Sequence, residues 1–257
     1  MESPMTTSLQ DEVALVTGAA GGIGRAICRS LLDAGVRVAL VDIDKAALED
    51  AAAELGSPDR VALFATDLTE DGQAGALPGL VAQRLGSLGI VVNNAGVRQI
   101  APLLDLEPAD WRRTLDVDLT APFVLLRAAL PAMVERGRGK IVNIASMAGH
   151  MAFQNRAAYC TAKAGLMMLT KTVAFEFGAK GIWCNAVAPG VVETPMTSAY
   201  FQDAAMAASI RANVPMERWA QPHEIAEPVT FLCGPGSDYV NGTTLFVDGG
   251  WTAGKGY

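Results

Sequence analysis

The sequence predicts an α/β fold, a doubly wound parallel sheet of about seven strands with helices on both faces. Apolar segments of strand length alternate along the chain with longer segments of helical composition. Each strand-like segment is a continuous apolar run, which is what a strand buried on both faces by crossover helices requires. No linker, internal repeat or low-complexity tract interrupts the chain, so we expect a single domain over residues 1–257.

The predicted elements follow one another in regular order. The predicted strands are short and apolar, and they span residues 13–17, 36–41, 60–65, 90–92, 140–145, 181–187 and 244–247. The predicted helices are rich in alanine and leucine, and they span residues 25–34, 45–55, 106–136 and 157–177. Pro108 is tolerated in the first turn of the third helix, whereas Pro122 and Pro131 are expected to bend it. We expect residues 1–10 to be flexible.

Composition and charge argue against several classes of function. The net charge of −7 and the scattered basic residues argue against nucleic acid or an anionic membrane surface as the main partner. No run of about 18 apolar residues occurs, so no membrane span is expected, and the first ten residues lack the features of a secretory signal. The four cysteines have no C-x-x-C spacing, which favours buried, reduced thiols over a metal site. The sequence therefore predicts a cytoplasmic protein.

A glycine-rich turn joins the first predicted strand to the first predicted helix. Gly18, Gly22 and Gly24 let the backbone approach a pyrophosphate, whose charge the following helix N-terminus favours; an ordinary tight turn is the alternative. Asp42 lies 20 residues after Gly22, at the end of the second predicted strand. A carboxylate there accepts hydrogen bonds from the ribose hydroxyls and repels a 2′-phosphate. Because residues 40–44 contain no Arg or Lys, the predicted cofactor is NAD.

Tyr159 and Lys163 lie four residues apart in a predicted helix. Residues i and i+4 share one face of a helix, so the phenol and the ammonium project into the same space. A fixed cation favours the phenolate, and a serine hydroxyl facing it could hold a substrate oxygen. Considered alone, such a helical pair is more often an ordinary surface feature than a functional site. With a serine opposite, it indicates machinery for moving a proton on or off an alcohol.

Taken together, these motifs resemble the short-chain dehydrogenase/reductase family. They occur in that family's order and at roughly its spacing over residues 11–250. The motifs are Thr17-Gly18-x-x-x-Gly22-x-Gly24, Asn93-Asn94-Ala95-Gly96, Ser146, Tyr159-x-x-x-Lys163 and Pro189-Gly190. The resemblance implies a Rossmann-type sheet and an NAD-dependent oxidoreductase that interconverts a secondary alcohol and a ketone by hydride transfer.

The resemblance also implies a role for each matching residue. Tyr159 would be the catalytic acid/base, Lys163 would favour its phenolate form and bind the nicotinamide ribose, and Ser146 would orient the substrate oxygen. Other matching positions would contact the cofactor: Ile23 in the glycine turn, Asp67 and Leu68 at the adenine, Asn94, Ala95 and Gly96 on the adenosine side, and Pro189, Gly190, Val192 and Thr194 at the carboxamide.

One position departs from the family pattern. The family commonly places an asparagine 28 residues before the serine, where it holds a water in a proton relay from the lysine; here that residue is Asp118 (146 − 28 = 118). Aspartate keeps the acceptor oxygen, loses the amide donor and adds a charge near Lys163. A tolerated substitution, an altered relay and an impaired enzyme all remain open. Asp118 is therefore a candidate catalytic residue.

Family geometry implies a substrate pocket lined by Arg98, His150, Gln154, Asn155 and a mobile segment over residues 195–214. These polar side chains favour a polyol, a sugar or another small hydroxylated substrate. His150 could instead be a solvent-facing loop residue.

Two alternative functions remain. A 3-oxoacyl thioester reductase shares every motif; Asp42 and the acidic balance count against it, while basic residues on the long helix favour it: Arg112, Arg113, Arg127 and Arg136. A catalytically weak NAD-binding protein is favoured by Asp118 and opposed by the complete Ser-Tyr-Lys set. The resemblance further implies a homotetramer formed through residues 106–136, 157–177 and 222–247.

Overall fold

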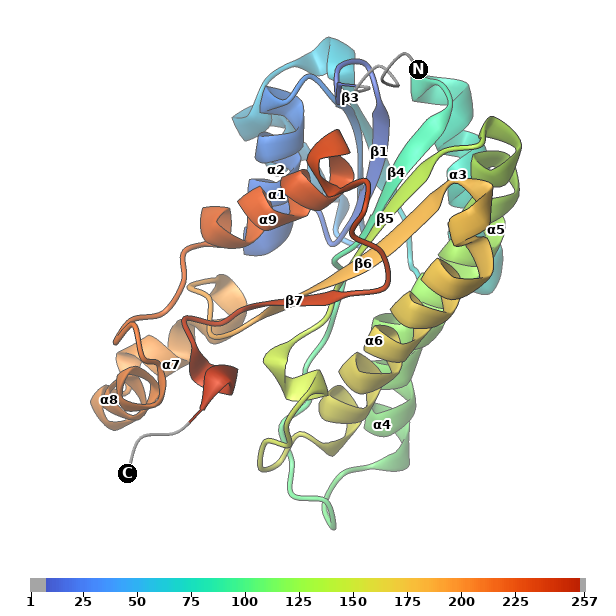
Figure 1. Ribbon diagram of the computed structural model, residues 1–257. Helices are drawn as coiled ribbons and strands as arrows, with labels where there is room; N and C mark the ends of the chain where they lie inside the picture. Colours follow the sequence, from blue (N-terminus) through green and yellow to red (C-terminus); the bar gives the residue numbers. More distant parts are fainter. Residues whose placement is uncertain (1–7, 255–257) are drawn as a thin grey trace.

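A computed structural model describes residues 8–254, and its strands form one sheet in the order β3-β2-β1-β4-β5-β6-β7 (Figure 1). All neighbouring strands pair in parallel. The strands are β1 (Val13–Thr17), β2 (Arg37–Asp42), β3 (Val61–Ala65), β4 (Leu88–Asn93), β5 (Gly139–Ile144), β6 (Ile182–Pro189) and β7 (Thr244–Val247). The predicted parallel sheet is confirmed, with strand ends within two residues of those expected. Residues 1–10 were expected to be flexible, and residues 1–7 of that stretch lie outside the described residues.

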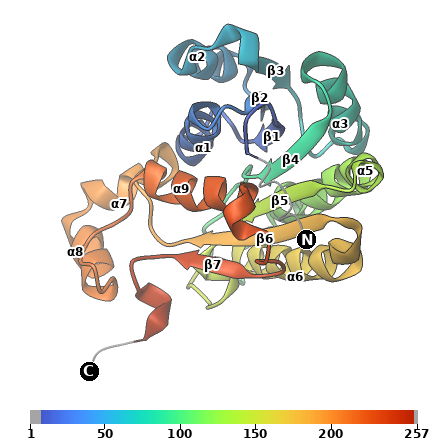
Figure 2. The same cartoon turned by 45° about the horizontal axis from the view of Figure 1, so that its top comes forward.

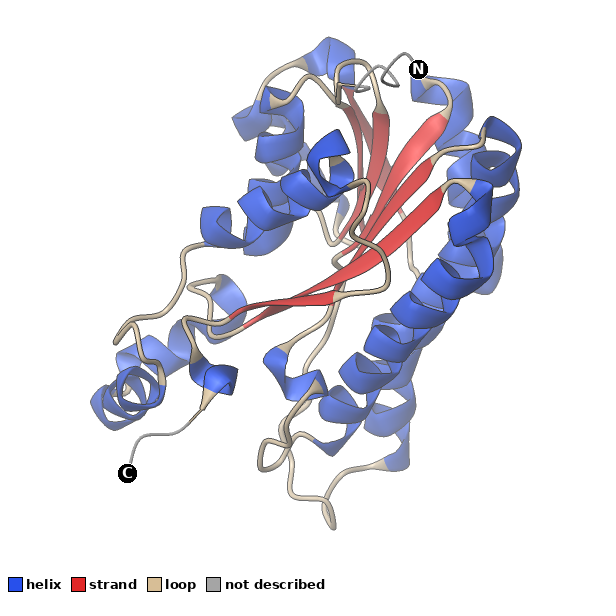
Figure 3. Cartoon of the chain, viewed as in Figure 1, coloured by secondary structure: helices blue, strands red, loops and turns tan. Residues whose placement is uncertain are grey.

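Helices cover both faces of the sheet, as Figures 2 and 3 show. On one face lie α1 (Gly22–Asp33), α2 (Lys45–Leu55) and α9 (Pro222–Cys233); on the other lie α3 (Asp71–Leu85), α5 (Ala121–Arg136) and α6 (Ala157–Phe177). Strand β1 shows how one strand serves both layers. Ala14 and Val16 belong to the first core and Val13 and Leu15 to the second, because successive strand side chains point to opposite faces.

The long predicted helix is continuous from Pro108 to Arg136 but contains a π turn. Helix α4 (Pro108–Leu115) joins α5 through the π segment Asp116–Thr120, where the Ala121 N–H donates to the carbonyl five residues back, that of Asp116. Pro122 has no N–H to donate to the Asp118 carbonyl, so regular helical bonding cannot continue through this turn. The irregularity expected at Pro122 is therefore a π turn over Asp116–Thr120, immediately before the proline.

By length and composition alone, the helix over Pro108–Arg136 could cross a membrane. In this fold it is a core helix. Leu125, Leu126 and Met133 are buried in the layer that α3, α5 and α6 form against the sheet. This helix is therefore not a membrane span.

Helix α3 is missing from the elements predicted from the sequence. Its segment contains Pro78 and three glycines, which weaken any helical signal. The remaining clue is the spacing of its buried residues, which recur every three or four positions: Ala74, Leu77, Pro78, Val81 and Leu85.

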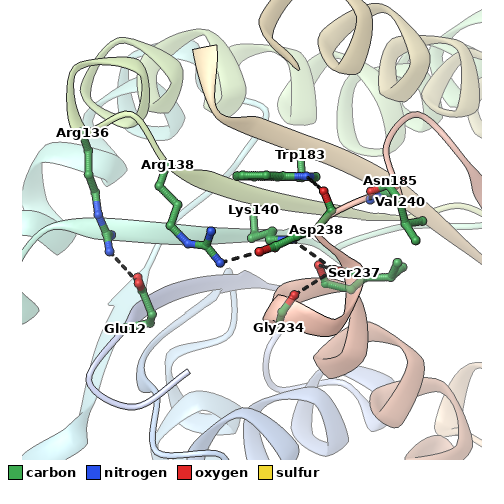
Figure 4. A network of polar contacts seen from close by, with 11 residues as sticks. Glu12, Arg136, Arg138, Lys140, Trp183, Asn185, Gly234, Ser237, Asp238 and Val240 are labelled. Atoms are coloured by element: carbon green, nitrogen blue, oxygen red, sulfur yellow. Dashed lines mark hydrogen bonds and ion pairs between the residues drawn. The ribbon is translucent and has the colours of Figure 1, made fainter. Parts of the chain in front are cut away.

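A polar network fixes the amino ends of β5 and β6 (Figure 4). Lys140 is buried, with its Nζ 2.7 Å from Asp238 Oδ1 and 3.1 Å from Ser237 Oγ, to which it donates. The Trp183 indole N–H donates to the Asp238 carbonyl at 2.8 Å. Burial lowers the pKa of Lys140, and its ion pair with Asp238 opposes that shift. These contacts tie both strands to the turn after α9, at the end opposite the carboxyl edge.

Candidate active site

A cavity of about 960 Å³ lies along the carboxyl ends of the central strands. Its walls come from the segments that follow β1 to β6 and from residues of α4 and α6. The strand order reverses direction between β1 and β4. In doubly wound sheets, ligands bind outside the carboxyl ends of the strands at such a reversal.

The glycine turn forms one end of this cavity. Gly18 has a φ of +63°, a conformation that favours glycine. A Cβ added at Gly24 would overlap the Gly18 carbonyl, and one at Gly22 would lie 3.1 Å from Thr194 Cγ2. The turn is therefore a tight backbone cradle that opens onto the N-terminus of α1. This geometry fits a pyrophosphate, which needs close backbone approach and the positive end of a helix dipole.

Two carboxylates flank the glycine end. Asp42, at the end of β2, accepts from the Ala20 N–H at 3.1 Å and from the Asp44 N–H at 3.3 Å. Asp67 accepts from the hydroxyl and the backbone N–H of Thr69, which lower the pKa of Asp67. Both line the cavity, so two carboxylates stand beside the glycine cradle.

Helix α6 and the end of β5 build the middle of the cavity, where Ser146, Tyr159 and Lys163 all line the wall. The Lys163 ammonium lies 5.7 Å from the centroid of the Tyr159 ring and donates to the Ile144 carbonyl at 3.0 Å. Ser146 Oγ accepts from the Ala148 N–H at 3.1 Å. Because that oxygen accepts a bond from the backbone, its own proton is available to a ligand.

Asp118 lies behind Lys163 rather than on the cavity wall. It is fully buried, with Oδ2 at 3.2 Å from the Lys163 ammonium and Oδ1 accepting from the Val97 N–H at 2.7 Å. The π turn carries this carboxylate. The order from the interior outward is therefore carboxylate, ammonium, phenol.

The far end of the cavity is formed by Arg98, Phe153, Arg156 and the first part of the segment 195–214, including Met196 and Tyr200. That segment contains a 3₁₀ turn over Pro195–Thr197, α7 (Ser198–Gln202) and α8 (Ala204–Asn213), and the two helices project beyond the sheet (Figure 1). Its mobility stays a prediction.

Comparison with known proteins shows the family. A family model described as enoyl-(acyl carrier protein) reductase matches residues 18–252. The cis-4-hydroxycyclohexanecarboxylate dehydrogenase of Sinomonas cyclohexanicum is 38% identical over 250 residues, covering 97% of this chain and 100% of that protein. The chain belongs to the short-chain dehydrogenase/reductase family. It is accordingly an oxidoreductase, and the resemblance seen in its motifs is confirmed.

Other members of this short-chain dehydrogenase family are similarly close. The D-threitol dehydrogenase of Mycolicibacterium smegmatis is 38% identical over 246 residues, covering 95% of this chain and 94% of that protein. A crystal structure of a candidate NAD(P)-dependent gluconate 5-dehydrogenase from Beutenbergia cavernae, with NADP bound at low occupancy, has a TM-score of 0.89 and 37% identity. It covers 96% of this chain and 99% of its own.

In this short-chain dehydrogenase, Lys163 and Asp118 form a buried ion pair. Burial alone would lower the pKa of Lys163, but the Asp118 carboxylate and the Tyr159 phenol outweigh burial and raise it. Burial raises the pKa of Asp118, and the neighbouring ammonium opposes that shift. Lys163 therefore stays a cation at neutral pH, and the buried Asp118 carboxylate partly neutralises its charge.

Three residues expected to contact substrate lie beside the cavity rather than in its wall. His150 is exposed, and its ring centroid is 5.1 Å from that of Phe246. Gln154 and Asn155 are also exposed, and the Asn155 carbonyl accepts from the Ala101 N–H. This placement does not support the expected contacts, which stay predictions. The loop instead contributes its neighbours Phe153 and Arg156 to the wall.

Sequence reasoning missed the second arginine of the wall. Arg156 is the residue before α6 and lies three positions before Tyr159, a spacing that places both on one side of a helix start. That spacing was a usable signal. Phe153 gave none, because only the folding of its loop brings it to the cavity. Met196 and Tyr200 lie in the segment 195–214 that family geometry implies for the pocket, and both line the cavity.

Among residues 8–254 no group of three or more His, Cys, Asp or Glu side chains could hold a metal ion. All four cysteines are free thiols; Cys28, Cys184 and Cys233 are buried, and burial raises the pKa of Cys233 to about 12.

Proposed function

We propose that this enzyme uses NAD to interconvert a secondary alcohol and its ketone, with Tyr159 as the acid/base. The observation that carries the proposal is that Ser146, Tyr159 and Lys163 share one cavity with the glycine cradle. In this proposal the substrate is a small hydroxylated compound, as the names of the polyol and hydroxy-acid dehydrogenases among the relatives suggest.

In this proposal, the residues around the cavity contact successive parts of a dinucleotide. The turn from Gly18 to Gly24, including Ile23, would hold the pyrophosphate, and Asp42 the adenosine ribose. The remaining predicted contacts line the same cavity: Asp67, Leu68, Asn94, Ala95, Gly96, Lys163, Pro189, Gly190, Val192 and Thr194. When bound, the nicotinamide ring accepts or gives the hydride.

The chain's own side chains would manage the proton. In oxidation Tyr159 removes the hydroxyl proton of the substrate, and in reduction it returns a proton to the carbonyl oxygen. Lys163, held by Asp118 and the Ile144 carbonyl, stabilises the phenolate. Ser146 donates its free hydroxyl proton to the substrate oxygen and stabilises charge that develops there.

Asp42 supports NAD over NADP, because a second negative charge at the ribose would face its carboxylate. The test is a panel of secondary alcohols with each cofactor: sugars, polyols, hydroxy acids, cyclic alcohols and hydroxyacyl thioesters. We expect turnover of at least one class with NAD, and a kcat/KM ratio of NAD to NADP that falls by about tenfold or more in Asp42→Ala. No turnover in the whole panel would refute the proposal, and a parent enzyme that prefers NADP would refute the cofactor assignment.

One alternative keeps specific support. Arg112 and Arg113 line the cavity and are exposed, as a site for an acidic carrier protein would require. Arg136 is instead paired with Glu12. The hydroxyacyl thioesters in the panel decide this alternative, since a 3-oxoacyl thioester reductase would turn over only these.

The glycine cradle gives a second prediction. Gly24→Ala is expected to weaken NADH binding by about tenfold or more, because the added methyl group overlaps the Gly18 carbonyl and forces the cradle to open. The dissociation constant is measured by NADH fluorescence. Gly79→Ala in the exposed part of α3, where an added methyl meets nothing within 4 Å, is the matched control. Equal affinities in the two variants would contradict the assignment of the cradle.

We further propose that the enzyme is a cytoplasmic homotetramer. Support comes from exposed apolar side chains on the elements expected at the subunit contacts, which are Phe123 on α5, Met168 and Phe175 on α6, Phe231 on α9 and Leu245 on β7.

A further inference from the structure

Two arginines stand together at the far end of the cavity, close to Tyr159. Arg98 follows the Asn93–Gly96 turn, and Arg156 precedes α6. Tyr200 lies between them. The Arg156 Nη2 donates to the Tyr200 hydroxyl at 2.6 Å, and the Arg98 guanidinium carbon is 4.9 Å from the centroid of the same ring.

No carboxylate balances these two cations within residues 8–254. Every ion pair in the described part of the chain involves other residues. Arg25, Arg136, Arg138 and Arg218, by contrast, each lie within 4 Å of an acidic side chain. Burial and the charge of Arg156 lower the pKa of Arg98. Two half-buried cations that share one wall are unfavourable unless a negative charge joins them.

The hydrogen-bonding capacity of both side chains is largely unused in the described structure. A guanidinium has five N–H donors in a planar fork. Arg98 donates from Nη2 to the Met196 carbonyl at 3.0 Å, and Arg156 donates from Nη2 to Tyr200. The Nε of each is buried and has no hydrogen-bond partner among the described residues. Such a fork matches the two oxygens of a carboxylate or a similar oxyanion.

We infer that the substrate carries an oxyanion group, such as a carboxylate, and that Arg98 and Arg156 bind it while Tyr159 acts on the hydroxyl. This inference rests on the proposed function and narrows its substrate to hydroxylated anions. Phe153 and Met196, in the same wall, contact the carbon skeleton. Because Met196 and Tyr200 belong to the segment 195–214, an anion held by both arginines also fixes that segment over the substrate.

The test measures binding rather than turnover. The complex of the enzyme with NADH is titrated calorimetrically with cyclohexanecarboxylate and with the neutral cyclohexanecarboxamide, which has nearly the same shape. We expect the carboxylate to bind about tenfold or more tightly than the amide, because charge-assisted hydrogen bonds to a partly buried guanidinium exceed neutral ones. Cyclohexanesulfonate and cyclohexyl phosphate identify which oxyanion is preferred.

Variants separate charge recognition from a structural role. Arg98→Met and Arg156→Met are each expected to reduce the ratio of carboxylate to amide affinity, and the double variant to abolish it. Arg84→Met, which removes an exposed arginine of α3, is the matched control and leaves the ratio unchanged. If the arginines only held α7 in place, both ligands would weaken equally and the ratio would not move.

Two results would overturn the inference. One is equal affinity of carboxylate and amide for the parent enzyme; the other is a preference that survives in the double variant. If the variants do not fold, the parent enzyme is titrated with both ligands at increasing ionic strength. A preference for the carboxylate that arises from these cations must decrease as ionic strength rises. If the enzyme oxidises neutral alcohols and binds carboxylate and amide equally, the proposed function stands and the inference fails. If it prefers the carboxylate but turns over no alcohol, only the proposed function fails.

Discussion

Replacing Tyr159 with phenylalanine is expected to lower kcat by about 10²- to 10⁴-fold and to leave the affinity for NADH nearly unchanged. The ring is retained, so its packing beside Lys163 persists and only the hydroxyl that transfers the proton is lost. Steady-state oxidation of the best alcohol in the panel gives kcat, and NADH fluorescence gives the dissociation constant.

The control for this substitution is Tyr239→Phe, which removes the hydroxyl of a fully exposed tyrosine. It should match the parent enzyme in both measurements. A Tyr159→Phe enzyme with the parent's kcat would show that another group moves the proton, and the assignment of Tyr159 would be wrong.

Replacing Lys163 with methionine is expected to lower the free energy of unfolding by about 3–5 kcal/mol at neutral pH. The change leaves the Asp118 carboxylate fully buried with no cation beside it. Burial raises the pKa of Asp118 above its unfolded value, and without the ammonium the hydrogen bond from the Val97 N–H is left to oppose that shift. Stability should therefore be retained at low pH, where the carboxyl is protonated in both states, and lost as the pH rises through the folded-state pKa.

Urea denaturation between pH 4 and pH 8 measures this dependence. The double variant Lys163→Met/Asp118→Asn removes both charges and should recover most of the lost stability, with little change over the same range. A stability loss in Lys163→Met that is equal at every pH would mean that missing packing, rather than an uncompensated charge, is the cause.

Much of the fold could be predicted because its signals are local. Most buried strands are apolar runs in the sequence, although β5 includes Lys140 and Asn143 and β6 includes Asn185. The predicted bounds of β7 agree with those observed. The Tyr159–Lys163 pair needed only helical periodicity, since four residues bring two side chains to one face. The glycine spacing is also a local signal, because the turn leaves no room for a side chain at Gly24, which packs against the Gly18 carbonyl.

The rest depends on distant segments meeting. Arg98 follows β4, Arg156 precedes α6 and Tyr200 lies in α7, and no spacing in the sequence connects the three. Direct contact between Asp118 and Lys163 was also beyond sequence reasoning, which placed the carboxylate near the lysine without fixing the distance. Glycines and Pro78 concealed α3, because its stability comes from packing on the sheet rather than from helical propensity.

The π turn at Asp116–Thr120 also sets the rotational phase of the helix that contains it. One residue turns a helix by about 100°, so deleting one here would rotate α5 by that angle relative to α4. Ala109, Arg112 and Arg113 before the turn face the cavity, whereas Leu125, Leu126 and Ala129 after it face the core. The α4 residues face the cavity and the α5 residues face the core only if the number of residues in the π turn is unchanged. The stretch from 108 to 136 should therefore tolerate substitutions at exposed positions but not a change of length.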